Sequence, residues 1–242
     1  MIKFVSVLML TTALFISPRM MAGIGNAYPT SGENPSIDLK SVMNMSAHVL
    51  YDSLNLGDLG LNPRAFKLAW KGFLHLAESG KLMNTDYFTV CDFSQSSRNK
   101  RLYIIDLTQM RVFKNTYVAH GRNSGGEFAQ AFSNRPESHK SSLGFYITGE
   151  TYFGQHGLSL KMKGIEPGIN DKAMARRIVM HGSSYVGDEF LNNNPFSGRS
   201  FGCPAIPADE RDEIINTIKE GTLLFIYHPS KTYITKSKIL NG

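Results

Sequence analysis

The chain has little cysteine and little tryptophan: two cysteines, Cys91 and Cys203, and one tryptophan among 242 residues. Two cysteines allow at most one disulfide, so the chain is not a scaffold held together by several bridges. Cysteine pairs at zinc-ligand spacing, phosphate-binding glycine loops and internal repeats are also missing. The sequence therefore lacks the signatures of zinc fingers, P-loop nucleotide-binding proteins and solenoids.

Charge of either sign is modest, with 26 Lys and Arg residues against 20 Asp and Glu residues and a formal net charge of +6. No basic run with interleaved aromatic residues accompanies this excess, so the sequence indicates no nucleic-acid partner. The small excess of positive charge is typical of a soluble protein surface, and it is compatible with an acidic substrate or a polyanionic envelope.

The apolar run at the N-terminus, from Phe4 to Ile16 after Lys3, is short. A membrane-spanning helix needs about 20 apolar residues. The run therefore predicts a secretory signal peptide over residues 1–22, with a retained anchor as the alternative. Its removal would leave an exported chain with no stable membrane insertion. Residues 23–37 are rich in Gly, Pro, Ser and Asn, and they predict a linker.

Residues 38–84 carry the apolar periodicity of two helices. The first covers about 39–54. The second begins at Pro63, a residue that suits a first helical position, and ends at Gly80. We expect a helical hairpin that packs on the domain after it, with Trp70 as a core residue rather than a sugar-stacking platform.

Residues 85–242 change to the pattern of short strands. Strands are expected over 87–93, 101–107, 145–148, 158–162, 178–180 and 223–227, with a hairpin over 111–119 that turns at Lys114-Asn115. Helices are expected over 170–177 and 207–220. Many short strands with few helices are typical of a sandwich or barrel, so the sequence predicts a mainly β domain.

Cys203 lies in the segment Gly198–Ile206 (GRSFGCPAI), and His181-Gly182 precedes it. A thiol attacks carbonyls as thiolate, which needs a nearby base, and His181 follows a short buried strand that would aim it. Gly202 would let a substrate approach closely, and the N–H groups of Gly202 and Cys203 would hold an oxyanion. The sequence predicts a cysteine nucleophile. A Cys91–Cys203 disulfide is the alternative, and it would block this chemistry.

Several nearby polar residues are candidate substrate contacts. The guanidinium of Arg199 suits a carboxylate, because it binds one through two parallel hydrogen bonds. Ser200 either hydrogen-bonds near the nucleophile or shapes the turn. His120 and His156 each lie beside a glycine, so each lines a pocket or is an ordinary core histidine. Asn123 belongs to a glycine-containing loop that would rim the cleft.

A zinc hydrolase is the rival chemistry, with His120, His156, His181 and Cys203 as four nitrogen and sulfur ligands. The chain has no His-Glu-x-x-His segment and no closely spaced ligand pair. The sequence therefore predicts neither a metal nor a cofactor.

His181-Gly182, followed after seventeen residues (183–199) by Ser200-Phe201-Gly202-Cys203, resembles the signature of the YkuD-type murein L,D-transpeptidase catalytic-domain family. Further strings resemble one branch of that family: Asp92-Phe93-Ser94, Lys100-Arg101-Leu102-Tyr103, Ala119-His120-Gly121, Phe132-Ser133-Asn134, Ser141-Ser142-Leu143-Gly144, His156-Gly157-Leu158-Ser159-Leu160, Asn170-Asp171 and Gly198-Arg199-Ser200. The likeness covers about residues 85–227. The wider family usually has histidine where this chain has Phe201, so any role of that second imidazole is absent.

The resemblance implies an L,D-transpeptidase-type β-sandwich in the periplasm that acts on peptidoglycan stem peptides. Cys203 would carry the acyl group as a thioester, and the carbonyl of Gly182 would orient the base His181. The acyl acceptor would be an amine of another stem, an envelope protein, or water, in which case the enzyme is a carboxypeptidase or an amidase. A wall-binding module without catalysis is the alternative of another class.

Overall fold

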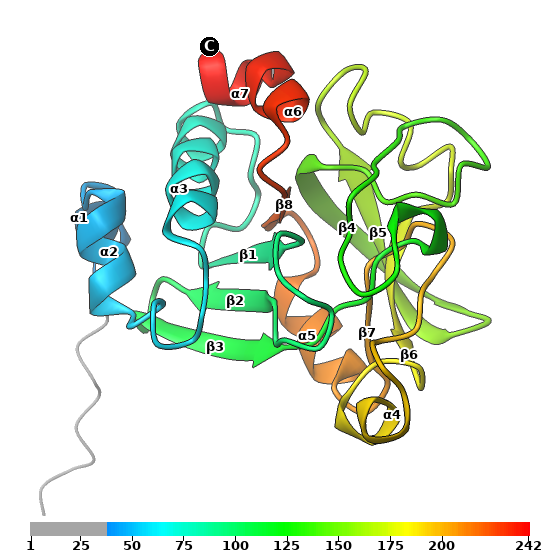
Figure 1. Ribbon diagram of the computed structural model, residues 1–242. Coiled ribbons are helices and arrows are strands. Elements are labelled where there is room, and N and C mark those ends of the chain that lie inside the picture. Colours follow the sequence, from blue (N-terminus) through cyan, green and yellow to red (C-terminus); the bar gives the residue numbers. More distant parts are fainter. Residues whose placement is uncertain (1–37) are drawn as a thin grey trace, which may run out of the picture. The chain divides into compact units, whose positions relative to one another are not determined.

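The computed structural model describes residues 38–242 (Figure 1). The signal peptide expected over 1–22 and the linker expected over 23–37 lie outside the described residues. Within 38–242, none of the helices combines the length and the hydropathy that a membrane span requires.

An eight-stranded sheet with the order β3-β2-β1-β8-β4-β5-β6-β7 forms the centre of the described residues. Its strands are β1 (Tyr87–Asp92), β2 (Leu102–Asp106), β3 (Arg111–Thr116), β4 (Gly144–Gly154), β5 (Gly157–Gly164), β6 (Val179–Ser183), β7 (Ala205–Pro207) and β8 (Leu223–Tyr227). The β1–β8 and β6–β7 pairs are parallel, and the other pairs are antiparallel.

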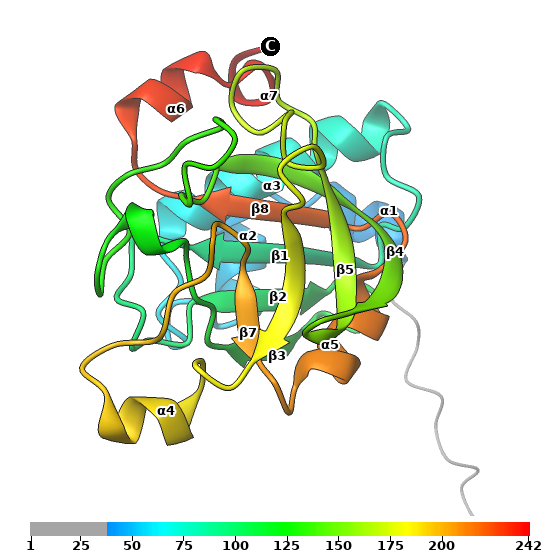
Figure 2. The same cartoon turned by 90° about the vertical axis from the view of Figure 1, so that its right-hand side faces the viewer.

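The sheet folds over on itself at β4. The first residues of β4 pair with β8, and its register with β5 shifts between Thr148 and Thr151. In Figure 2 the strands β1, β2, β3 and β8 run horizontally and β5, β6 and β7 run vertically, while β4 curves from one direction into the other. Beyond β3, Ala119 pairs with Ala205 of β7, with its N–H 2.8 Å from the carbonyl oxygen. The two ends of the sheet therefore meet, and the predicted mainly β, sandwich-like fold is confirmed.

Three helices precede the sheet: α1 (Leu39–Met43), α2 (Ala47–Ser53) and α3 (Pro63–Glu78). The single helix expected over 39–54 is wrong, because Ser46 caps a new helix by accepting a hydrogen bond from the Val49 N–H. Pro63 begins α3 as expected, behind the cap Asn62. The hairpin and the domain boundary at 84–85 stay predictions.

Helix α3 packs on the sheet through aromatic rings. Trp70 is 2% exposed, lies 5.8 Å from the ring of Phe88, and donates its indole N–H to the carbonyl of Met45 at 3.1 Å. The prediction that Trp70 is a core residue is confirmed. At Gly72 an added Cβ would lie 2.2 Å from the ring of Phe145, so the helix backbone approaches β4 closely there.

The hairpin expected over 111–119 is wrong. Strand β3 runs straight through Lys114 and Asn115, which pair with Ile104 and Tyr103 of β2. Lys114 also forms an ion pair of 2.6 Å with Glu213. Cross-strand pairing therefore outweighs the local turn preference of these two residues.

The helix expected over 170–177 is also wrong, because this segment consists of turns. The side chain of Asn170 is buried and bonds the Glu166 N–H and the carbonyls of Leu143 and Phe145. These bonds tie the segment to β4, and an asparagine that bonds backbone groups in this way disfavours a continuous helix.

The remaining helical elements are η1 (Arg122–Ser124), α4 (Asp188–Asn193), α5 (Arg211–Ile218), α6 (Lys231–Lys236) and α7 (Lys238–Asn241). Helix α5 lies inside the range 207–220 expected for it, but it is shorter, since β7 occupies residues up to Pro207. Its buried face consists of Ile214, Ile215 and Ile218. Helix α7 contacts α3 through Lys71, whose ammonium donates to the Leu240 carbonyl at 2.7 Å.

Candidate active site

A cavity of about 640 Å³ contains both residues of the predicted nucleophile–base pair. Its walls come from the β4–β5 turn, the segment before β6, strand β6 and the loop before β7. The lining residues are Tyr152, Gly154, Gln155, His156, Ser159, Arg176, Arg177, Ile178, Val179, His181, Tyr185, Arg199, Ser200, Phe201 and Cys203.

The thiol of Cys203 is free and partly exposed, and Cys91 is a free, fully buried residue of β1. The disulfide alternative is therefore wrong. The Cys203 sulfur lies 3.5 Å from the Val179 N–H donor nitrogen and 3.8 Å from the Arg177 carbonyl oxygen, to which the thiol donates. Burial raises the pKa of Cys203, while the Val179 N–H and the charge of Arg176 act in the opposite direction.

His181 lies on β6, paired with Ala205 of β7 and Ser159 of β5, and is 4% exposed. Its Nδ1 donates to the Gly182 carbonyl at 3.0 Å, the contact that the family resemblance implied. This bond leaves Nε2 as the acceptor nitrogen of a neutral ring. Burial lowers the pKa of His181, which favours that neutral state. Within residues 38–242, no hydrogen bond joins the His181 ring to the Cys203 sulfur.

The turn before Cys203 is held by Ser200. Its hydroxyl donates to the Cys203 carbonyl at 2.6 Å and accepts from the Gly202 N–H at 3.0 Å. Ser200 therefore shapes the turn. We expected the Gly202 N–H to be free to bind an oxyanion, but it is already bonded to Ser200. The Cys203 N–H has no hydrogen-bond partner in the described part of the chain, so it remains the candidate oxyanion donor.

Gly202 itself is required by its backbone. Its φ is +122°, a conformation that residues with a Cβ rarely adopt. An added Cβ would also lie 2.8 Å from the Lys140 carbonyl oxygen. Glycine here serves the close packing of the turn rather than a free N–H group.

His156 and Arg199 line the cavity as expected. The His156 ring lies 4.4 Å from that of His181 and nearly parallel to it. The Arg199 guanidinium donates to the carbonyls of Gly125 at 3.0 Å and Arg122 at 3.4 Å. It thus ties the loop at 122–125 to the cavity while leaving charge at the rim.

His120 and Asn123 do not line the cavity, so their expected substrate contacts are not supported. His120 is 1% exposed, and its Nδ1 accepts from Arg101 at 2.8 Å. Burial, with the charge of Arg101, lowers the pKa of His120 to about 3. Asn123 is exposed and donates to the Ser138 carbonyl at 3.0 Å.

The zinc site of the rival chemistry is not assembled. His120 is bonded to Arg101 away from the cavity that holds the other three candidate ligands. In the described part of the chain, no group of three or more His, Cys, Asp and Glu side chains is arranged to hold a metal ion.

Arg176 and Arg177 line the cavity, although the sequence reasoning did not name them. Together with Arg199 they give the cavity three guanidinium groups, and no Asp or Glu from residues 38–242 lines it. The available signal was the pair of arginines directly before the buried strand that ends at His181. A cavity with this charge suits an anionic ligand.

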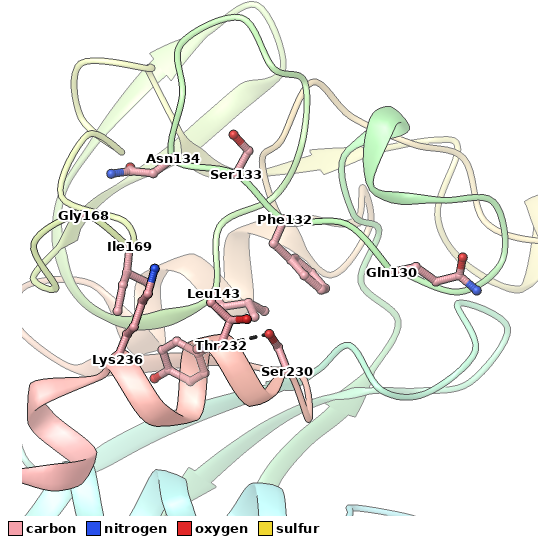
Figure 3. Close-up of a pocket in the computed structure, with 11 residues that line it drawn as sticks. Gln130, Phe132, Ser133, Asn134, Leu143, Gly168, Ile169, Ser230, Thr232 and Lys236 are labelled. Atoms are coloured by element: carbon pink, nitrogen blue, oxygen red, sulfur yellow. Dashed lines mark hydrogen bonds between the residues drawn. The ribbon is translucent and has the colours of Figure 1, made fainter.

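A second pocket, of about 350 Å³, lies between the loop at 130–143, the turn at 168–169 and α6 (Figure 3). Phe132, Leu143 and Tyr233 provide its apolar lining, and Asn134 and Lys236 are among its polar groups. The described residues that line it include no cysteine and no histidine, and the cavity of Cys203 is therefore the candidate active site.

A family model described as the L,D-transpeptidase catalytic domain matches residues 58–227. The match covers well over half of the chain, which therefore belongs to the L,D-transpeptidase catalytic-domain family, as the resemblance predicted. No curated protein matches the sequence.

Similar solved structures are distant. A variant of the helical cell shape determining protein Pgp2 from Campylobacter jejuni has 14% identity and a TM-score of 0.41 over 66% of this chain and 57% of its own. An L,D-transpeptidase from Mycobacterium smegmatis has 8% identity and a TM-score of 0.37, covering 59% of each chain. L,D-transpeptidase 3 from Mycobacterium tuberculosis has 9% identity and a TM-score of 0.38, covering 59% of this chain and 61% of its own. The matched parts thus span less than two thirds of these proteins.

Proposed function

We propose that this protein is a periplasmic cysteine acyltransferase that cleaves peptidoglycan stem peptides through a thioester on Cys203. The observation that carries the proposal is one cavity with a free thiol, a neutral histidine and three guanidinium groups. Membership of the L,D-transpeptidase catalytic-domain family supports it.

The first half-reaction would use Nε2 of His181 as the base. It takes the proton of the Cys203 thiol, after the thiol turns from the Arg177 carbonyl, and the sulfur bonds to the scissile carbonyl carbon. The Cys203 N–H stabilises the oxyanion, and loss of one such donor typically costs about 2.7–4 kcal/mol of barrier. The carbon–nitrogen bond then breaks, and His181 returns the proton to the departing D-alanine amine.

The second half-reaction decides between transfer and hydrolysis. An amine of a second stem or of an envelope protein, or a water molecule, loses a proton to His181 and attacks the thioester. The carbon–sulfur bond breaks, and the thiol of Cys203 is restored with that proton. Both outcomes use the same residues, so the acceptor that reaches the thioester determines the product.

The arginines of the cavity would orient the substrate. A stem peptide that ends in diaminopimelate and D-alanine carries free carboxylates, and guanidinium groups bind carboxylates with defined geometry. Arg199 at the rim is one receptor. Arg177, whose exposed side chain has no hydrogen-bond or ion-pair partner within residues 38–242, is another.

The test incubates the exported form of the protein with tetrapeptide-bearing muropeptides and reads the products by mass spectrometry. Cross-linked dimers show transfer, and tripeptides show hydrolysis. Cys203→Ala should abolish both, whereas Cys91→Ala should keep both. Unchanged substrate together with binding to sacculi would refute the acyltransferase and leave a wall-binding module.

Export is tested separately. If residues 1–22 are a signal peptide, the intact mass of the protein purified from the periplasm corresponds to a chain that has lost them. A full-length mass in the membrane fraction would instead identify a retained anchor.

A further inference from the structure

Arg176 is a half-buried arginine whose charge is not neutralised by any carboxylate among the described residues. Its guanidinium makes four hydrogen bonds, all to neutral oxygens. These are the carbonyls of Ser133 (2.7 Å) and Lys140 (2.6 Å) and the hydroxyls of Ser142 (2.5 Å) and Ser138 (3.3 Å). No ion pair with an acidic side chain accompanies them. A guanidinium held in this way keeps its full charge at a fixed place.

That place is beside the turn that carries the nucleophile. Arg176 lines the same cavity as Cys203, and a Cβ on Gly202 would lie 3.2 Å from Nη2 of Arg176. The Lys140 carbonyl that Arg176 binds is the group closest to the same Cβ position, at 2.8 Å. The guanidinium and the carbonyl it holds therefore pack against the turn that presents the sulfur.

Arg176 also joins this turn to the loop at 133–142. Arg176 bonds this loop, and the loop bonds the turn, because the Ser141 hydroxyl donates to the Gly202 carbonyl at 3.2 Å. The same loop forms one wall of the second pocket, where Figure 3 shows Ser133 and Asn134 above helix α6. Arg176 thus orders the loop that contacts the active-site turn.

The charge of Arg176 matters because of how the Cys203 thiol is placed before a substrate binds. The thiol has no hydrogen bond to His181 within residues 38–242 and instead contacts the Arg177 carbonyl and the Val179 N–H. Burial lowers the pKa of His181 and so favours its neutral ring, which supplies no positive charge before the reaction begins. The charge that opposes the effect of burial on the thiol comes from Arg176.

We propose that Arg176 is a positioning residue that stabilises the thiolate of Cys203 by its fixed charge and, by its hydrogen bonds, holds the loop at 133–142 against which the turn at Gly202 packs. The inference deepens the proposed function, because it concerns how the proposed nucleophile is activated. The charge of Arg176 would then make transfer of the thiol proton from Cys203 to His181 less costly.

Other groups face the thiol from the elements around it. His181 comes from β6, His156 from the β4–β5 turn and Tyr185 from the segment after β6. Arg177 precedes β6, and Arg199 precedes the nucleophile turn. Burial raises the pKa of Tyr185, so its hydroxyl stays neutral near pH 7. Among these groups, Arg176 combines a permanent charge with packing against Gly202.

The test measures the rate of alkylation of Cys203 by iodoacetamide between pH 5.5 and 10, with intact mass as the readout. Fully buried Cys91 reports unfolding, since a second label requires the fold to open. In Arg176→Gln, Cys203 should be alkylated at least about threefold more slowly than in the wild type at pH 7. This is the effect on the thiolate of losing one unit charge in a strongly screening environment. The midpoint of the curve of alkylation rate against pH should move to higher pH in this variant.

Two variants complete the design. Arg176→Lys keeps the charge and loses the forked hydrogen bonds, so its midpoint should stay near that of the wild type while its melting temperature falls. Arg135→Gln removes one charge from the same loop without lining the cavity, and its profile should match the wild type.

A singly labelled Arg176→Gln protein with the wild-type profile would overturn the inference. If that variant takes a second label because it unfolds, Arg176→Lys decides: a wild-type midpoint supports the charge effect, and a raised midpoint contradicts it. A shifted profile in a protein that converts no muropeptide would refute the proposed function and leave this inference standing.

Discussion

The imidazole of His156 stacks on the imidazole of His181, with ring centres 4.4 Å apart and planes inclined by 21°. His156 is exposed on the β4–β5 turn, whereas His181 is buried on β6. Burial lowers the pKa of His181, and a positive charge on His156 lowers it further, because two stacked imidazolium ions repel each other. The pair thus keeps His181 in the neutral form that accepts a proton.

We expect His156→Gln to raise the pKa of His181 and to move the acid limb of kcat/KM to higher pH. A base must be neutral to act, so a raised pKa increases its protonated, inactive fraction at any acidic pH. The plateau at neutral pH should change less. The pH profile of muropeptide conversion measures this, with exposed His75→Gln on α3 as the control. An acid limb at or below the wild-type position would contradict the prediction.

Ser200→Ala should destabilise the protein and slow the reaction. The buried hydroxyl serves both the Cys203 carbonyl and the Gly202 N–H, and leaving them unpaired costs about 1–3 kcal/mol. Urea unfolding gives the loss in stability, and alkylation of Cys203 reports the disordered turn. Ser184→Ala, an exposed serine near the end of β6, should change stability by about 0.5 kcal/mol or less. Equal stability of Ser200→Ala and the wild type would show that the turn holds without this hydroxyl.

Gly72→Ala tests the contact between α3 and the sheet. Alanine favours a helix by about 1 kcal/mol over glycine, but its Cβ would lie 2.2 Å from the ring of Phe145. Overpacking of this kind costs about 1–3 kcal/mol, so we expect a net loss of up to about 2 kcal/mol in urea unfolding. Gly126→Ala has its nearest atoms at 3.7 Å and is the control. A more stable Gly72→Ala protein would mean that α3 does not approach β4 this closely.

Glu166 makes the stability depend on pH. Its buried carboxylate accepts hydrogen bonds from the Phe145 N–H and from the hydroxyls of Tyr233 and Ser237, and no basic side chain pairs with it within residues 38–242. Burial raises its pKa above the usual value despite these bonds. The folded protein therefore holds this proton at pH values where the unfolded chain has lost it, so stability falls as pH rises from the ordinary glutamate pKa toward the raised one.

Glu166→Gln removes this titration while its amide oxygen can still accept the Phe145 N–H. We expect the midpoint of urea unfolding to vary less between pH 4.5 and 7 in this variant than in the wild type. Exposed Glu220→Gln should keep the wild-type dependence. An identical pH dependence in Glu166→Gln and the wild type would refute the prediction.

Much of the sheet was predictable because its strands carry their own signal. The strands expected over 87–93, 101–107 and 223–227 consist mostly of β-branched, aromatic and other apolar residues, and the observed strands β1, β2 and β8 are fully or almost fully buried. The errors fall where tertiary contacts oppose local preference. Lys114-Asn115 looks like a turn but pairs with β2, and Asn170 ends a helical pattern by bonding the backbone near β4.

The site divides in the same way. Cys203, His181 and Gly182 could be predicted as site residues because their spacing resembles the family signature. The His181–Gly182 contact joins adjacent residues. Arg176 was missed because its partners lie 34–43 positions away in the chain. His120 was misplaced for a similar reason: nothing beside it in the sequence shows that Arg101, nineteen positions earlier, binds it in the core.

The amino-acid sequence by itself determined the strand-rich class of the domain and the identity of the thiol and imidazole, since periodicity, local turns and spacing are properties of neighbouring residues. The tertiary structure alone decided which cations surround the thiol and which N–H stays free for an oxyanion. It also decided that His156 rather than His120 stacks on His181. Those relationships join segments far apart in the chain, and the folding of the sheet at β4 brings them to one cavity.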